Sequence, residues 1–198
     1  MTLLILGSVI LGIIIGKLGL LPLLDASSDL ISAIALNILV FTVGLDMGHN
    51  REVWQKISRF GWKIIFLPLG IALGSLLGAF CVNFFLNLPT NHALAVGAGF
   101  GWYSLSGVML KEMVSIELGT VAFLANVFRE LLAVILIPIL ALKLGGLAAI
   151  APCGATSMDT TLPLISRSAG AEMALLGFIS GAVLSMLVPV LVPLLVNL

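Results

Sequence analysis

The sequence predicts an all-α protein that crosses a membrane several times, and three observations lead to that prediction. Hydrophobic residues make up 61% of the 198 positions and charged residues only 9%, too few for the solvated surface of a water-soluble domain. The apolar residues fall in stretches of about 20, the length that a helix needs to cross the hydrocarbon core. Irregular backbone facing lipid is excluded, because its polar groups would lack hydrogen-bond partners.

The apolar segments divide the chain into about six or seven spans within one transmembrane domain, residues 1–198. The sixth segment is unusual, because residues 151–163 contain two prolines, a glycine and several hydroxyl side chains around one carboxylate. Such a composition is typical of a discontinuous or re-entrant segment that lines a cavity. The expected spans are residues 2–23, 30–48, 63–88, 92–110, 118–142, 147–166 and 171–197.

The first two spans and the loop after them indicate the orientation. No Lys or Arg precedes the first apolar run and no small-residue cleavage site closes it, so we expect a retained helix rather than a secretory signal. The loop after span 30–48 is cytoplasmic by the positive-inside rule, which places the N-terminus inside as well. The basic residues of this loop are Arg51, Lys56, Arg59 and Lys63.

Charge and cysteine content argue against several classes of function. Nine Lys and Arg balance nine Asp and Glu, and no basic run could follow a phosphate backbone, so nucleic acid is not an expected partner. Cys81 and Cys153 lie in apolar stretches without metal-ligand spacing, and we expect both to be buried small residues. The sequence indicates no metal site and no cofactor.

Catalysis is also not expected. The serines of the Ser104-Leu105-Ser106-Gly107 stretch faintly resemble the serine motif of intramembrane proteases. A serine nucleophile needs a base within hydrogen-bond reach, whereas the two histidines of the chain, His49 and His92, lie at span edges. Ser104 and Ser106 are instead candidates for a polar lining beside flexible glycine backbone. The alternative is helix packing with an aromatic anchor at the membrane interface.

Ionisable residues at bilayer depth cost several kcal/mol unless they find a partner, so those in span 118–142 are candidates for function. Arg129 and Glu130 lie near its middle, and Asn126 is about one helical turn from both. Helical spacing allows one polar face to present the amide, the guanidinium and the carboxylate. The alternative is an internal structural ion pair, although adjacent residues point about 100° apart on a helix and neutralise each other poorly.

Asp159 is the second candidate, and it shares the broken segment with Thr156 and Ser157. Half-helix ends carry partial charges, which transporters use to bind charged substrates or coupling ions. The alternative is a loop in which Asp159 caps a helix just outside the membrane. Asp46 is a weaker candidate, because it ends the second span beside the basic loop and fits an interfacial charge.

Three motifs of the chain are distinctive when taken together: GFGWYSLSG at residues 99–107, Arg129-Glu130-Leu131, and CGATSMDTTLP at residues 153–163. They resemble the lysine exporter (LysO) family, in matching order over nearly the whole chain. The resemblance implies efflux of L-lysine and toxic lysine analogues across the bacterial inner membrane, driven by proton exchange, with Glu130 at the family's intramembrane acidic site. A more distant likeness, to cation/proton antiporters and bile-acid transporters, implies inverted repeats and crossed broken helices.

Longer members of this family carry an additional N-terminal part of about three spans with another acidic residue. We therefore expect a partner, either a small hydrophobic membrane subunit or a second copy of this chain. The substrate fits the candidate residues, since Glu130 and Asp159 can accept ammonium groups while Arg129 or a half-helix N-terminus receives the carboxylate. Competition between protons and lysine for Glu130 is the minimal chemistry of an antiporter. The alternatives are a proton or cation channel and a non-transporting membrane subunit.

Overall fold

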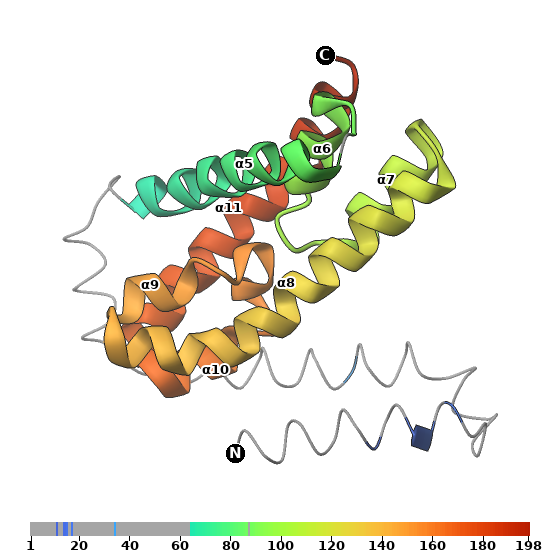
Figure 1. The fold of residues 1–198 in the computed structure, drawn as a ribbon. Helices are drawn as coiled ribbons and strands as arrows, with labels where there is room; N and C mark the ends of the chain where they lie inside the picture. The colour runs from blue at the N-terminus through green and yellow to red at the C-terminus, as the bar shows by residue number, and fades with distance from the viewer. Residues whose placement is uncertain (1–10, 12–13, 16, 18–33, 35–63, 87) are drawn as a thin grey trace. The chain divides into compact units, whose positions relative to one another are not determined.

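The computed structural model describes residues 64–86 and 88–198, together with positions 11, 14, 15, 17 and 34. The chain divides into two compact units, Met1–Leu39 and Val40–Leu198, and the helices labelled in Figure 1 belong to the second unit. The expected spans 2–23 and 30–48 lie almost entirely outside the described residues. Asp46 and the basic loop at residues 51–63 also lie outside them.

Three long apolar helices confirm the prediction of an all-α polytopic membrane protein. They are α5 (Phe66–Leu86), α8 (Ile116–Lys143) and α11 (Ala171–Val196), with mean hydropathies of 2.0, 2.1 and 2.4. Each is long enough to cross a hydrocarbon core of about 30 Å. The part of the chain that the structure describes contains helices and connecting turns but no strand.

The expected continuous span at residues 92–110 is wrong, because the structure divides it into α6 (Thr90–Gly97) and α7 (Tyr103–Met113). We call residues 98–102 between them the first break. The backbone takes positive φ angles of 48° at Phe100 and 103° at Gly101 there. A helix cannot continue through that conformation, which a non-glycine residue such as Phe100 adopts only at a cost of about 1–2 kcal/mol.

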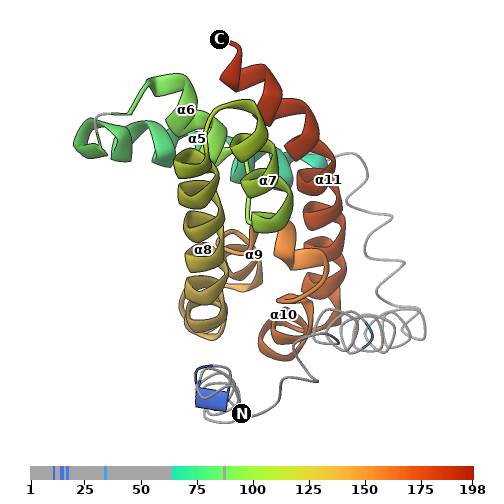
Figure 2. The same ribbon diagram turned by 90° about the vertical axis from the view of Figure 1, so that its right-hand side faces the viewer.

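The predicted interruption near residues 151–163 is confirmed. It separates α9 (Gly146–Ile150) from α10 (Leu162–Ala169), and the 3₁₀ helix η2 (Gly154–Met158) lies between them. We call residues 151–161 the second break. Figure 2 shows α8 and α11 on either side of the broken elements α7, α9 and α10.

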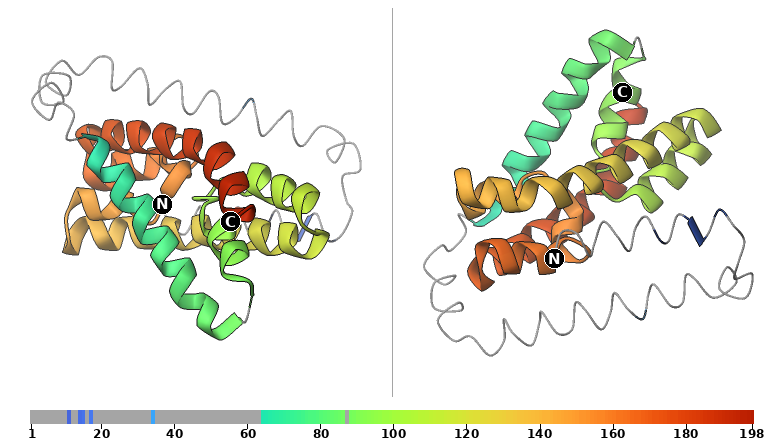
Figure 3. Two further views of the ribbon diagram at one scale, coloured as in Figure 1. Left: turned by 90° about the horizontal axis from the view of Figure 1, so that it is seen from above. Right: turned by 60° about the horizontal axis from the view of Figure 1, so that its bottom comes forward.

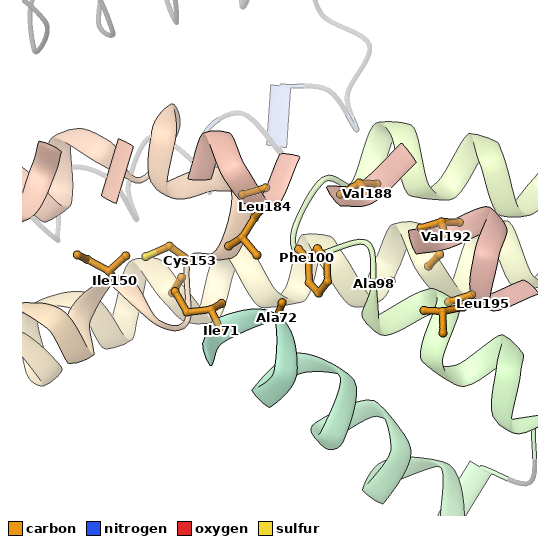
Figure 4. Packing of buried hydrophobic residues seen from close by; sticks show 14 of the residues in the cluster. Ile71, Ala72, Ala98, Phe100, Ile150, Cys153, Leu184, Val188, Val192 and Leu195 are labelled. Carbon is orange, nitrogen blue, oxygen red and sulfur yellow. The ribbon is translucent and has the colours of Figure 1, made fainter. Parts of the chain in front are cut away.

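The two breaks touch each other inside the core. The Ala155 N–H donates a 2.8 Å hydrogen bond to the Phe100 carbonyl oxygen, and Gly154 has a φ of 62° directly against that carbonyl. Figure 4 shows the Phe100 ring between Ala72 of α5 and residues Leu184 and Val188 of α11. Buried apolar packing therefore surrounds the contact of Phe100 with Gly154 and Ala155, where a backbone hydrogen bond joins the two breaks. We call this contact the crossing.

Small residues allow the elements around the crossing to approach closely. A Cβ atom at Gly181 of α11 would lie 2.7 Å from the Ala155 carbonyl oxygen, and one at Gly119 of α8 would lie 2.7 Å from the Gly107 oxygen of α7. These are backbone contacts that only glycine permits.

Helix α5 packs less extensively than α8 and α11 on the remainder of the unit. It buries only Pro68, Ile71 and Ala72, and Figure 3 shows it crossing α8 at a steep angle. Cys81, beyond these buried residues, is exposed. The prediction that both cysteines are buried is therefore wrong for Cys81, whereas Cys153 is fully buried.

Candidate functional site

The structure brings together the two carboxylates that the sequence singled out separately. Glu130 lies in the middle of α8, and Asp159 follows η2 in the second break. The Thr160 hydroxyl lies near the Glu130 side chain, and the Glu130 and Asp159 carboxylates are close enough to interact electrostatically. Thr160 also bonds to Asp159, through its N–H at 2.6 Å and its hydroxyl at 3.4 Å. Glu130, Asp159 and Thr160 therefore form one acidic cluster.

Tyr103 borders this acidic cluster from the first residue of α7. Its phenol interacts electrostatically with both Glu130 and Asp159. The Tyr103 ring packs edge-on against Phe123 of α8, with ring centroids 5.5 Å apart and an interplanar angle of 84°. That contact holds an aromatic ring beside the two carboxylates, where an ammonium group could meet both the negative charge and the ring face.

Asn126 holds the first break in place. Its Oδ1 accepts a 2.7 Å hydrogen bond from the Gly101 N–H, and its Nδ2 donates to Ser106 Oγ at 3.2 Å and to the Ala122 oxygen at 2.9 Å. Ser106 Oγ in turn donates to the Trp102 oxygen at 2.8 Å. Both side chains are buried, and these contacts use the donors and acceptors that were expected to face a substrate.

Thr156 and Ser157 play the corresponding part inside the second break. The Thr156 hydroxyl donates to the Cys153 oxygen at 2.8 Å, while Ser157 Oγ lies 2.7 Å from the Gly154 oxygen and 2.8 Å from the Gly177 oxygen of α11. Both residues are buried. The carbonyls of Cys153 and Gly154 belong to the interruption itself, where regular helical partners are missing, and the bond to Gly177 ties the break to α11.

Arg129 points away from the acidic cluster. Its Nε donates to the Pro152 oxygen at 3.0 Å and its Nη1 donates to Ser75 Oγ of α5 at 2.8 Å. The expectation that Asn126, Arg129 and Glu130 present one polar face is therefore corrected. Asn126 reaches the first break, Arg129 reaches Pro152 and α5, and Glu130 faces Asp159 and Thr160. They diverge because neighbouring positions on a helix point about 100° apart.

The remaining candidates are placed as follows. Ser104 is exposed and lines a shallow surface pocket with Gly107 and Lys111, while Asp46 lies outside the described residues. Tyr103 and Thr160 are functional candidates that sequence reasoning missed, although both lie inside the motifs that carried the family resemblance. Thr160 directly follows Asp159, which was the available signal for it, whereas Tyr103 has no charged neighbour in the sequence.

The arrangement suits the binding of an ammonium group. Two carboxylates, a hydroxyl and an aromatic ring lie near one another, from α7, α8 and the second break. Groups of these kinds bind ammonium ions in proteins. Among the described residues, no group of three or more His, Cys, Asp or Glu side chains is arranged to hold a metal ion.

Comparisons with known proteins find similarity to lysine exporters. A family model described as lysine exporter LysO matches residues 6–196. The lysine exporter LysO of Escherichia coli strain K12 is 39% identical over 188 residues, which cover 94% of this chain and 61% of that protein. A relative from Haemophilus influenzae, provisionally named a lysine exporter, is 35% identical over 153 residues, which cover 77% of each chain. No solved structure matches the chain significantly.

Proposed function

Because this chain belongs to the lysine exporter LysO family, we propose that it exports L-lysine and lysine analogues across the bacterial inner membrane in exchange for protons. The chain spans 61% of the length of the Escherichia coli relative, so the activity of that longer protein is proposed for this chain. The observation that supports it most directly is that Glu130 of α8 and Asp159 of the second break lie close enough to interact electrostatically, beside Thr160.

The acidic cluster matches the chemistry of lysine, which carries two ammonium groups and one carboxylate. A charge-assisted hydrogen bond from an ammonium group to a carboxylate is about twice as strong as a neutral one. Glu130 and Asp159 can supply such acceptors, with Thr160 and Tyr103 completing the surroundings of the cation. An apolar solute has no charged group that could pair with these two carboxylates.

The amino end of α7 is the best-placed group for the carboxylate of lysine. The Tyr103 N–H donates to the Gly101 oxygen at 3.0 Å, but the N–H groups of Ser104 and Leu105 after it have no intrahelical acceptors, and a helix N-terminus favours an anion. Tyr103, the first residue of α7, also contacts the acidic cluster electrostatically, which places this helix end beside the proposed cation site. The arrangement can receive both ends of an amino acid.

Proton exchange follows from the same carboxylates. A carboxylate that binds either a proton or an ammonium group couples the two movements, because it cannot hold both at once. In the proposed cycle, Glu130 releases lysine on the outer side as it takes up a proton, and releases that proton in the cytoplasm. The chain acts as a transporter and forms no covalent intermediate with its substrate.

A partner chain is part of the proposal, either a small hydrophobic membrane subunit or a second copy. The rival functions are a proton or cation channel and a non-transporting membrane subunit. Proteoliposomes that contain the purified chain should show counterflow of labelled lysine, measured with and without a candidate partner. Saturable exchange supports the transporter. Unsaturable lysine or proton flux would indicate a channel, and no flux under either condition would indicate a non-transporting subunit.

A further inference from the structure

Arg129 connects three elements of the fold through two donors. Its Nε reaches the Pro152 carbonyl oxygen in the second break, and its Nη1 reaches Ser75 Oγ on α5. Ser75 Oγ then donates a 2.9 Å hydrogen bond to the oxygen of Gly97, the last residue of α6. The guanidinium thus contacts the second break directly, and it reaches the carboxyl end of α6, just before the first break, through Ser75.

The two carbonyl groups that Arg129 reaches, Pro152 directly and Gly97 through Ser75, lie where broken helices end. The last carbonyls of a helix have no intrahelical donor and carry partial negative charge. Gly97 ends α6 just before the first break, and Pro152 lies just beyond the end of α9. A fixed positive charge between them compensates both groups where water is scarce.

The guanidinium also lies against the contact between the two breaks. A side chain at Gly154 would collide with the Phe100 carbonyl oxygen, and its Cβ would lie 3.1 Å from the Arg129 Cζ. The Ala155 N–H bonds to the same Phe100 oxygen. Arg129 therefore occupies the α5 side of the crossing, whereas Glu130, the next residue of α8, contacts the acidic cluster.

The geometry points to Arg129, with Ser75 as its relay, as a positioning residue that keeps the two breaks in contact and so holds Asp159 and Thr160 near Glu130. It acts on transport through these residues and does not receive the substrate carboxylate. The assignment deepens the proposed export, on which it rests for its substrate. Arginine suits the task because its planar fork donates in two fixed directions, whereas lysine offers a single point charge.

The native cysteines offer a readout that needs no substrate. Cys153 in the second break is fully buried and Cys81 is exposed, and the chain has only these two cysteines. In a Cys81→Ser background, the alkylation rate of Cys153 in the detergent-solubilised full chain reports opening of the crossing. Arg129→Gln should raise this rate at least about tenfold, because local opening becomes easier when its closing contacts are lost.

Conservative variants and a matched control accompany that measurement. Arg129→Lys keeps the charge and should raise the Cys153 rate by less than Arg129→Gln does, while Ser75→Ala should act in the same direction. Lys143→Gln removes an exposed charge from the same helix and should leave the rate unchanged. Arg129→Lys and Ser75→Ala also decide the matter if Arg129→Gln fails to insert.

A second readout separates positioning from substrate binding. Diaminopentane is lysine without its carboxylate, so competition assays in proteoliposomes give an affinity ratio of lysine to diaminopentane. Loss of a positioning residue weakens the affinities for lysine and for diaminopentane alike. The affinity ratio in Arg129→Lys should therefore stay within about twofold of the ratio in the unmodified chain. Loss of a carboxylate ligand would weaken lysine selectively.

Two results would overturn the assignment. One is a Cys153 thiol that stays as protected in the Arg129 variants as in the control. The other is a selective loss of lysine affinity against diaminopentane. Failure of the unmodified chain to bind lysine would refute the proposed export instead, while alkylation of Cys153 would still decide the role of Arg129.

Discussion

The first break, residues 98–102, and the second break, residues 151–161, meet at Phe100 but direct their polar groups differently. In the first break, the Gly101 N–H bonds to Asn126 of α8, and no ionisable side chain lies within the break. In the second break, Thr156 and Ser157 bond inward, while Asp159 interacts electrostatically with Glu130 and Thr160 lies beside both carboxylates. An interrupted membrane helix can thus be a fixed support or a binding surface, depending on where its spare polar groups point.

The largest expected effect lies on the acidic cluster. Glu130→Gln keeps the size of the side chain but removes its charge, and it should reduce lysine export about a hundredfold, since a charge-assisted contact to the cation is lost. Export from proteoliposomes against a gradient is the measurement, with the amount of inserted protein checked in parallel. Glu112→Gln, an exposed carboxylate on α7, is the control that should export normally.

Glu130→Asp sharpens the same test, because it retains the charge on a shorter stem. It should keep part of the transport with altered lysine affinity. Unmodified export by correctly inserted Glu130→Gln would show that Glu130 is structural, and the site would then have to move to Asp159 and the second break.

The next effect concerns the contact between the breaks. Gly154→Ala combines a φ of 62° with a collision against the Phe100 carbonyl oxygen, and it should destabilise the fold by about 3 kcal/mol or more. Gly145→Ala is the matched control, because Gly145 has a φ of 92° but open space around it, and strain alone costs about 1–2 kcal/mol. Thermal unfolding in detergent measures both. Equal losses of stability in the two variants would mean that the contact between the breaks tolerates a side chain at position 154.

The second break was predictable from sequence because its signal is local. Pro152, Gly154 and the hydroxyl residues around Asp159 stand out within a few positions of an otherwise apolar chain. Lipid imposes a strong constraint on such a stretch, since its backbone must be bonded within protein. Composition alone therefore indicates the interruption.

The first break was not predictable in the same way, because residues 98–102 read as an ordinary apolar helix with glycines. The partner that holds its backbone, Asn126, lies on another helix, and helical periodicity carries no information about it. The same reason applies to Arg129 and Glu130, whose side chains diverge toward different elements. Sequence spacing gave their angular separation but not which element packs on each side.

A smaller effect is expected from the support of the first break. Asn126→Leu leaves the Gly101 N–H and the Ala122 carbonyl oxygen without this partner, and it should cost about 1–3 kcal/mol of stability. The lysine affinity of the protein that remains folded should not change, because Asn126 does not contact the acidic cluster. A selective change in lysine affinity at normal thermal stability would contradict the supporting role and place Asn126 on the substrate path.

The smallest effect separates two adjacent threonines of the second break. Thr160 is exposed, bonds to Asp159 and lies near Glu130, whereas Thr161 is buried and donates to the Thr156 carbonyl oxygen at 2.9 Å. Thr160→Val should weaken the apparent affinity for lysine about three- to tenfold without lowering the thermal stability, because it removes one hydroxyl beside the carboxylates. Thr161→Val should do the opposite, costing about 1 kcal/mol of stability while leaving the affinity unchanged. Thr160→Ser restores the hydroxyl and should recover most of the lost affinity. If both valine variants lose stability alike and neither changes lysine binding, Thr160 belongs to the internal support, and the outward polar face of the second break reduces to Asp159 alone.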